Sequence, residues 1–133
     1  MQNIFTVMLM IFLFLGVSCR TTVDFPSSSE LPAAEISAKV KQGKNDNYKI
    51  KLEAEHLAEP DRLQPSRDVY VVWLDTDENG SKNIGRLIPE NNKKASIETT
   101  SAYKPIRIFI TAENEANIDY PRGEVVFESK RIN

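Results

Sequence analysis

The chain has 133 residues, with 17 lysines and arginines against 19 aspartates and glutamates, a formal net charge of −2, and a single cysteine. This length fits one domain. Because its basic residues are interleaved with acidic ones and form no clustered basic run, we expect no nucleic-acid partner, and a lone cysteine excludes a disulfide framework or a thiolate metal site within the chain.

An uncharged apolar stretch, residues 4–17, ends just before Cys19. It is shorter than the roughly 20 residues of a bilayer-spanning helix, but it has the length of a signal-peptide core. Gly16, Val17 and Ser18 lead into the cysteine, and the segment resembles the lipobox of bacterial lipoproteins, with Gly16 standing where that pattern prefers leucine. We expect a lipoprotein signal peptide over residues 1–18 and a lipid on Cys19. The alternatives are a segment that is left uncleaved or is cleaved without lipid, or a buried strand or helix.

The residues after Cys19 indicate where the protein resides. A lipid on Cys19 would anchor it to a membrane of the bacterial cell envelope. Arg20 follows, instead of the aspartate that retains lipoproteins in the inner membrane of some Gram-negative bacteria, which favours the outer membrane with the domain facing the periplasm. Residues 19–33 contain Pro26, Pro32 and three consecutive serines without helical or strand periodicity, and this composition predicts a flexible tether.

Residues 34–133 are predicted to form the folded domain. Short apolar stretches recur there between Gly, Asn and Pro turn signals, a pattern typical of an all-β sandwich or barrel. The expected strands are residues 36–41, 48–54, 68–75, 83–88, 93–100, 106–110 and 124–130. Seven strands in about 100 residues match an antiparallel immunoglobulin-like β-sandwich, although strand number alone also fits a small barrel.

Two of these strands differ in pattern. Residues 48–54 alternate apolar and polar side chains, which predicts one wet face. Residues 69–74 are apolar on both alternations, so we expect a central strand covered on both faces, with Trp73 as the core tryptophan of the sandwich. Asn79-Gly80 then predicts a type I′ turn. Residues 54–63, interrupted by Pro60, predict a connection and not a helix.

Four short motifs stand in the second half of the chain. They are VYVVWL at residues 69–74, IGRL at 84–87, IRIFITAE at 106–113 and PRGEVV at 121–126. Together they resemble the periplasmic C-terminal domain of anti-sigma-K factors, over about half of the chain. The resemblance implies a fold and not anti-sigma activity, because those factors bind their sigma factor through a cytoplasmic domain that does not stand before the apolar stretch here.

Residues 75–80 copy the first six positions of a D-x-[DN]-x-[DN]-G calcium loop, with Asp75, Asp77 and Asn79 as the candidate ligands. An EF-hand loop also needs a bidentate glutamate at position twelve. That position is Arg86 here, and its charge would repel the ion. We therefore interpret the segment as an acidic hairpin tip and expect neither a metal nor a cofactor.

Catalytic and recognition residues are few. His56 is the only histidine, and no G-x-S-x-G turn is present to supply a nucleophile for it, so we expect no catalytic residue and no enzyme. Tyr103 and Tyr120 lie near prolines in predicted loops. They are candidates for a recognition surface, the alternative being ordinary packing over the ends of the sandwich.

The sequence thus favours a non-enzymatic, lipid-anchored protein of the cell envelope. Its domain would bind another envelope protein or serve a structural role, through a sheet face, a loop end or an exposed edge strand. The alternative is a ligand-binding module that takes calcium or a glycan at one loop end, with residues 75–80 as the place to look.

Overall fold

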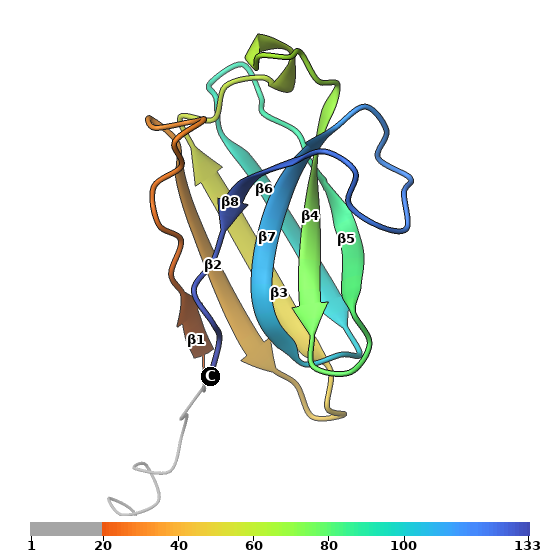
Figure 1. The fold of residues 1–133 in the computed structure, drawn as a ribbon. Helices are drawn as coiled ribbons and strands as arrows, with labels where there is room; N and C mark the ends of the chain where they lie inside the picture. The colour runs from red at the N-terminus through yellow and green to blue at the C-terminus, as the bar shows by residue number, and fades with distance from the viewer. Residues whose placement is uncertain (1–19) are drawn as a thin grey trace, which may run out of the picture.

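The computed structural model describes residues 20–133, which fold into two four-stranded antiparallel sheets packed as a sandwich (Figure 1). This confirms the all-β sandwich that the sequence predicts. The signal peptide expected over residues 1–18, and Cys19, lie outside the described residues. No helix within residues 20–133 has the length and hydrophobicity needed to cross a membrane.

The chain passes from one sheet to the other three times. One sheet has the order β1 (Arg20–Val23), β2 (Glu35–Gln42), β3 (Tyr48–Glu55) and β6 (Ala95–Ser101). The other has the order β5 (Ser81–Leu87), β4 (Val69–Thr76), β7 (Pro105–Glu113) and β8 (Glu124–Glu128). A short 3-10 turn, η2 (Pro60–Arg62), lies in the connection between β3 and β4, where the sequence predicts no α-helix.

The core lies between the two sheets. Alternate side chains of each strand point inward, as the period of two requires. The first sheet contributes Ala38, Val40, Ile50, Leu52 and Ala54, and the second contributes Tyr70, Val72, Leu74, Ile108 and Ile110. These alternations bury one face of each sheet against the other, so the inward register is fixed by the apolar pattern.

Strand β1 corrects two expectations, the count of seven strands and the flexible tether over residues 19–33. Residues 20–23 pair antiparallel with β2, with Val23 opposite Ala38. Val23 and, further along, Leu31 are buried in the core. Ser28 turns the chain back, because its hydroxyl accepts hydrogen bonds from the backbone N–H groups of Glu30 and Leu31. Isolated apolar residues can anchor a segment that shows no periodicity, provided that a sheet edge is there to receive them.

Trp73 corrects a third expectation, because it lies on the outer face of the second sheet and not between the sheets. Strand β4 is covered on both faces, as its sequence predicts. On the outer face Trp73 stacks on Phe109, with ring centroids 6.2 Å apart. Ile118, from the loop between β7 and β8, closes over both rings. The alternation along β4 separates two faces, but it does not say which one meets the other sheet.

A chain of buried hydrogen bonds fastens this loop to the sheet. Trp73 Nε1 donates to Thr111 Oγ1 at 2.8 Å, and Thr111 Oγ1 donates to Glu113 Oε1 at 2.8 Å. The same carboxylate oxygen accepts from the backbone N–H groups of Arg122 and Gly123, at 3.0 and 2.9 Å. A β-carbon at Gly123 would overlap the carbonyl oxygen of Ala112, so only glycine fits there. The chain of bonds therefore holds residues 114–123 over the tryptophan.

Tyr70 connects the core to the segment that follows β3. Its hydroxyl donates to the carbonyl oxygen of Ala58 at 2.7 Å. Burial of the side chain, with a smaller effect from the charge of Asp61, raises the pKa of Tyr70 to about 12.

Replacing Thr111 by valine is expected to lower the free energy of unfolding by about 2 kcal/mol, because the buried Trp73 N–H loses its acceptor and the Glu113 carboxylate loses a donor. Urea unfolding would measure the change. Thr100→Val is the control, because Thr100 is exposed on β6 and its replacement should shift the value by less than about 0.5 kcal/mol. Equal effects of the two variants would contradict the importance of the bond chain.

Tyr70→Phe should change how stability depends on pH. The folded-state pKa of about 12 exceeds the ordinary value of 10.0, so the stability linked to this proton is complete below pH 10 and is lost as pH rises through 12. At pH 8 the variant should be less stable by about 1 kcal/mol, the value of one hydrogen bond. Between pH 8 and pH 11 the free energy of unfolding of the wild type should fall by about 1 kcal/mol through this group, whereas that of the variant should not. Urea unfolding at both pH values tests this, and a constant difference between the two proteins would refute it.

Candidate functional site

Strand β8 forms one edge of the second sheet, because in the described part of the chain it pairs with β7 alone. Just past its end, the Ser129 N–H donates to the Ile108 carbonyl, and the Lys130 N–H donates to the Asp24 carbonyl, each at 2.8 Å. The second bond joins the edge of the second sheet to the segment that follows β1 in the first. Peptide groups alternate in direction along a strand, so those of Glu128 point away from β7, as the Lys130 N–H does.

Ser129 holds this crossing in place. Its side chain is buried, and its hydroxyl accepts from the Ile108 N–H at 2.9 Å and donates to the Lys130 carbonyl at 2.9 Å. The hydroxyl thus pairs with a backbone donor of β7 and with a backbone acceptor of the chain just past β8. The result is a fixed direction for Lys130 toward Asp24.

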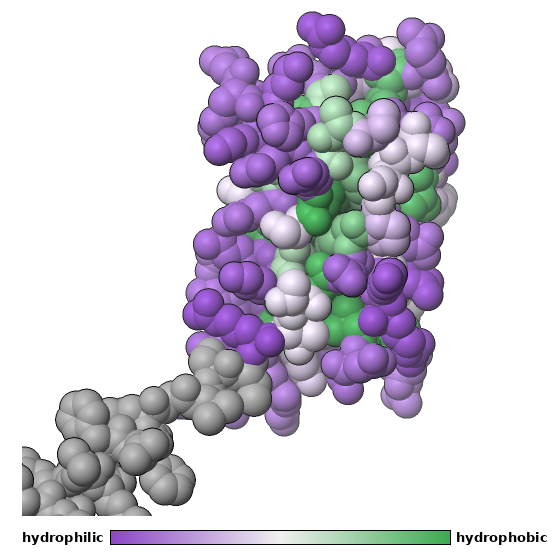
Figure 2. Space-filling model, turned by 90° about the vertical axis from the view of Figure 1, so that its left-hand side faces the viewer, coloured by the Kyte–Doolittle hydropathy of each residue, from purple (hydrophilic) through white to green (hydrophobic). Residues whose placement is uncertain are grey.

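Beyond the Lys130–Asp24 bond, residues 26–30 and β8 separate and leave an open groove of about 680 Å³. The groove is lined by residues 26–30 and 124–129. Val126 and Phe127 of this lining are buried, whereas the Val125 side chain is 49% exposed. Figure 2 views this side of the molecule and shows a strip of hydrophobic atoms between hydrophilic ones.

The charged residues that line the groove are all acidic: Glu30, Glu124 and Glu128. Glu128 Oε1 lies 3.3 Å from the guanidinium of Arg107 and is partly neutralised by it. Glu30 and Glu124 form no ion pair with another residue of the described chain. The groove therefore has a negative potential to which these two carboxylates contribute most.

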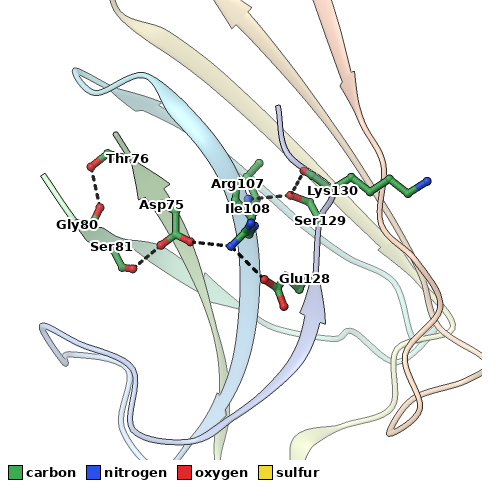
Figure 3. Close-up of polar contacts among 9 residues, drawn as sticks. All are labelled: Asp75, Thr76, Gly80, Ser81, Arg107, Ile108, Glu128, Ser129 and Lys130. Atoms are coloured by element: carbon green, nitrogen blue, oxygen red, sulfur yellow. Dashed lines mark hydrogen bonds and ion pairs between the residues drawn. The ribbon is translucent and has the colours of Figure 1, made fainter. Parts of the chain in front are cut away.

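A polar row crosses the outer face of the second sheet and ends at this groove (Figure 3). Ser81 Oγ donates to Asp75 Oδ1, and Arg107 lies 3.8 Å from Asp75 Oδ2 on one side and 3.3 Å from Glu128 on the other. Each group comes from a different strand, in the order β5, β4, β7 and β8. Because the Arg107 side chain is about two-fifths exposed, the pairs contribute little to stability, about 0–1 kcal/mol each.

The candidate calcium ligands are not arranged as a cage around a cation. The Asp75 carboxylate is engaged by Ser81 and Arg107, while Asp77 and Asn79 are exposed at the tip between β4 and β5. Among residues 20–133, no three His, Cys, Asp or Glu side chains come together as a metal site would require.

This tip also corrects the predicted type I′ turn. Of its two central residues, Gly80 alone has a positive φ, +67°, whereas a type I′ turn needs two. Thr76 closes the four-residue loop instead. Its N–H and its hydroxyl both donate to the Gly80 carbonyl, at 3.0 and 2.7 Å, and the hydroxyl accepts from the Asn79 N–H.

The two candidate recognition tyrosines lie in different loops, Tyr103 between β6 and β7 and Tyr120 between β7 and β8. The two residues are 39% and 61% exposed, and each ring has a cation 5.1 Å from its centroid, Lys82 over Tyr103 and Arg122 over Tyr120. Such contacts are worth about 0.5–1 kcal/mol at exposed sites. The rings therefore form two separate surfaces.

Sequence reasoning missed the groove. Its walls come from residues 26–30 and 124–129, which lie about a hundred positions apart in the chain, and the first wall was expected to be a tether. The one local signal was Ser28, whose hydroxyl can turn the backbone.

No family model, no curated protein and no solved structure matches this chain.

Ser129→Ala is expected to lower the free energy of unfolding by about 1–2 kcal/mol, because the buried Ile108 N–H loses its acceptor. The local effect should be larger than the global one, with faster hydrogen exchange at the Lys130 amide. Ser96→Ala, at an exposed site on β6, is the matched control. An unchanged exchange rate at Lys130 would show that Ser129 does not hold the crossing.

Proposed function

We propose that the chain is a non-enzymatic, lipid-anchored protein of a bacterial cell envelope, whose sandwich binds another envelope protein along the edge of β8. The observation that supports binding is the groove beside this unpaired strand edge. The support for an anchor is the apolar stretch of residues 4–17, with the lipobox-like residues that end at Cys19. The residue after Cys19 is Arg20 and not the aspartate that retains some lipoproteins in the inner membrane, which supports a location on the periplasmic face of the outer membrane.

The ordered β1 changes what such an anchor would do. Because β1 starts at Arg20, next to Cys19, no flexible spacer separates a lipid on Cys19 from the sheet. The domain would sit at the bilayer surface with the end of the sandwich that carries Arg20 facing the lipid. Arg20 lies opposite Lys41 at that end, and basic side chains near a bilayer favour anionic headgroups. The groove would then open along the side of the anchored domain.

We also propose that the sandwich is immunoglobulin-like. The order β5-β4-β7-β8 corresponds to the C′-C-F-G sheet of that fold, and β2-β3-β6 corresponds to A-B-E, with β1 as an additional edge strand. This assignment agrees with the resemblance of residues 68–129 to the anti-sigma-K C-terminal domain. A fold of this kind hosts many functions, so the site and the anchor support the proposal and the fold does not.

A non-enzymatic role is supported by the surroundings of His56. The residue is exposed, has a φ of +54° in the connection after β3, and makes no side-chain hydrogen bond within the described chain. General acid–base chemistry would need a partner within hydrogen-bond reach.

Cys19→Ala tests the anchor. Expressed in a bacterial host, the wild type is expected in the membrane fraction, with an intact mass that shows loss of residues 1–18 and a diacylglycerol on Cys19. The variant should keep residues 1–18 and carry no lipid. Ser18→Ala is the matched control, because it keeps a small residue before the cysteine and should still be processed. A lipid-free wild type that fractionates like Cys19→Ala would refute the anchor.

A further inference from the structure

We infer that the groove beside β8 accepts an extended, basic peptide segment of a partner protein, which adds a strand to the free edge of β8. The inference rests on the proposed function only in taking the occupant to be a protein. Main-chain hydrogen bonds would provide affinity, and the groove side chains would provide selectivity, as in other cases of strand addition.

The geometry of β8 suits this mode of binding. Its five residues span about 17 Å at the rise of an antiparallel strand, enough for an equally long partner strand. The outward peptide groups of Glu128 offer a donor and an acceptor to such a strand. Residues 26–30 stand across the groove and form its second wall.

Features of the second wall keep the groove from being filled by the chain itself. The segment that accepts a hydrogen bond from Lys130 at Asp24, just past β8, continues to Pro26, which has no N–H and cannot extend the pairing. Ser28 then turns the backbone through its bonds to Glu30 and Leu31. Among residues 20–133, no strand thus pairs with the edge of β8 between Glu124 and Glu128.

The charges favour a basic occupant and disfavour a second copy of this chain. Glu30 and Glu124 would pair with lysine or arginine side chains of an added strand, and no lysine or arginine lines the groove to repel them. Strand β8 has the sequence EVVFE, so two copies paired antiparallel would place Glu124 opposite Glu128 twice. Like charges directly opposite each other destabilise a strand pair, and charged edges of this kind oppose edge-to-edge association.

The experiment uses the full chain in an uncharged detergent and a fluorescent ten-residue peptide of alternating lysine and valine, blocked at both ends. Fluorescence polarisation measures binding, with protein-free micelles as the blank. A glutamate–valine peptide is the charge control, and a lysine–valine peptide methylated on alternate backbone nitrogens is the strand control. We expect the unmodified lysine–valine peptide to bind at least about tenfold tighter than either control.

Protein variants locate the binding. The double variant Glu30→Lys, Glu124→Lys should weaken binding about tenfold, whereas Glu90→Lys, Glu115→Lys has the same net charge at exposed sites outside the groove and should leave binding unchanged. Glu128→Pro removes an outward N–H and should also weaken binding. Thermal unfolding checks that each variant is folded, and the two double variants test the inference even if Glu128→Pro does not fold.

Three results would overturn the inference: no binding of the lysine–valine peptide, equal binding of the methylated peptide, or equal loss in the two double variants, which would indicate attraction by net charge alone. A dimer of the wild type that competes with the peptide would assign the groove to a second copy. These outcomes do not depend on a lipid on Cys19. The proposed peptide binding and the proposed anchor can therefore be refuted separately.

Discussion

The structure depends on covering β4 on both faces. Residues 70–74 of this strand are all buried, and packing against one other sheet can cover only one of their two sets of side chains. The first sheet covers Tyr70, Val72 and Leu74, while the loop of residues 114–123 covers Val71 and Trp73. From that loop, Ile118 is the one side chain in the buried outer cluster of the described chain, so the loop depends on hydrogen bonds to stay in place. The buried Glu113 carboxylate, which accepts from Thr111 and from two backbone N–H groups, provides part of them. The Asn83 side-chain amide provides others, because it donates to the carbonyl oxygens of Ala116 and Ile118.

The position of β8 follows from this arrangement. The loop leaves β7 at Glu113 and returns at Gly123, where the absence of a side chain lets the backbone lie directly against Ala112. Strand β8 therefore begins beside the end of β7 and runs back along it as an edge. At the other end of β8, Ser129 directs the chain to Asp24, where the Lys130 N–H joins the two sheets. The groove is what remains between that point and the turn at Ser28.

An open strand edge is a liability for a monomeric protein, because it can pair with other chains without selection. This edge is short, and a glutamate stands at each of its ends, so it has two features that restrict pairing. In the proposed strand addition, the same features would make the edge selective, because an acidic rim over an apolar strip favours extended segments with basic side chains. Protection from self-association and the proposed recognition of a basic partner would thus have one physical basis.

The sequence by itself determined the all-β class, seven of the eight strands, the inward alternation of β2 and β3 and the two-sided burial of β4, because each depends on local periodicity that a packed sheet must obey. It also determined the lipobox-like pattern before Cys19. Only the tertiary structure decided that Arg20–Val23 is a strand, that Trp73 faces outward under a loop, and that residues 26–30 and β8 form the two walls of a groove. These features join segments that lie far apart in the chain. A short segment such as Arg20–Val23 has no periodicity to reveal it, and it becomes a strand because the edge of β2 supplies its hydrogen bonds.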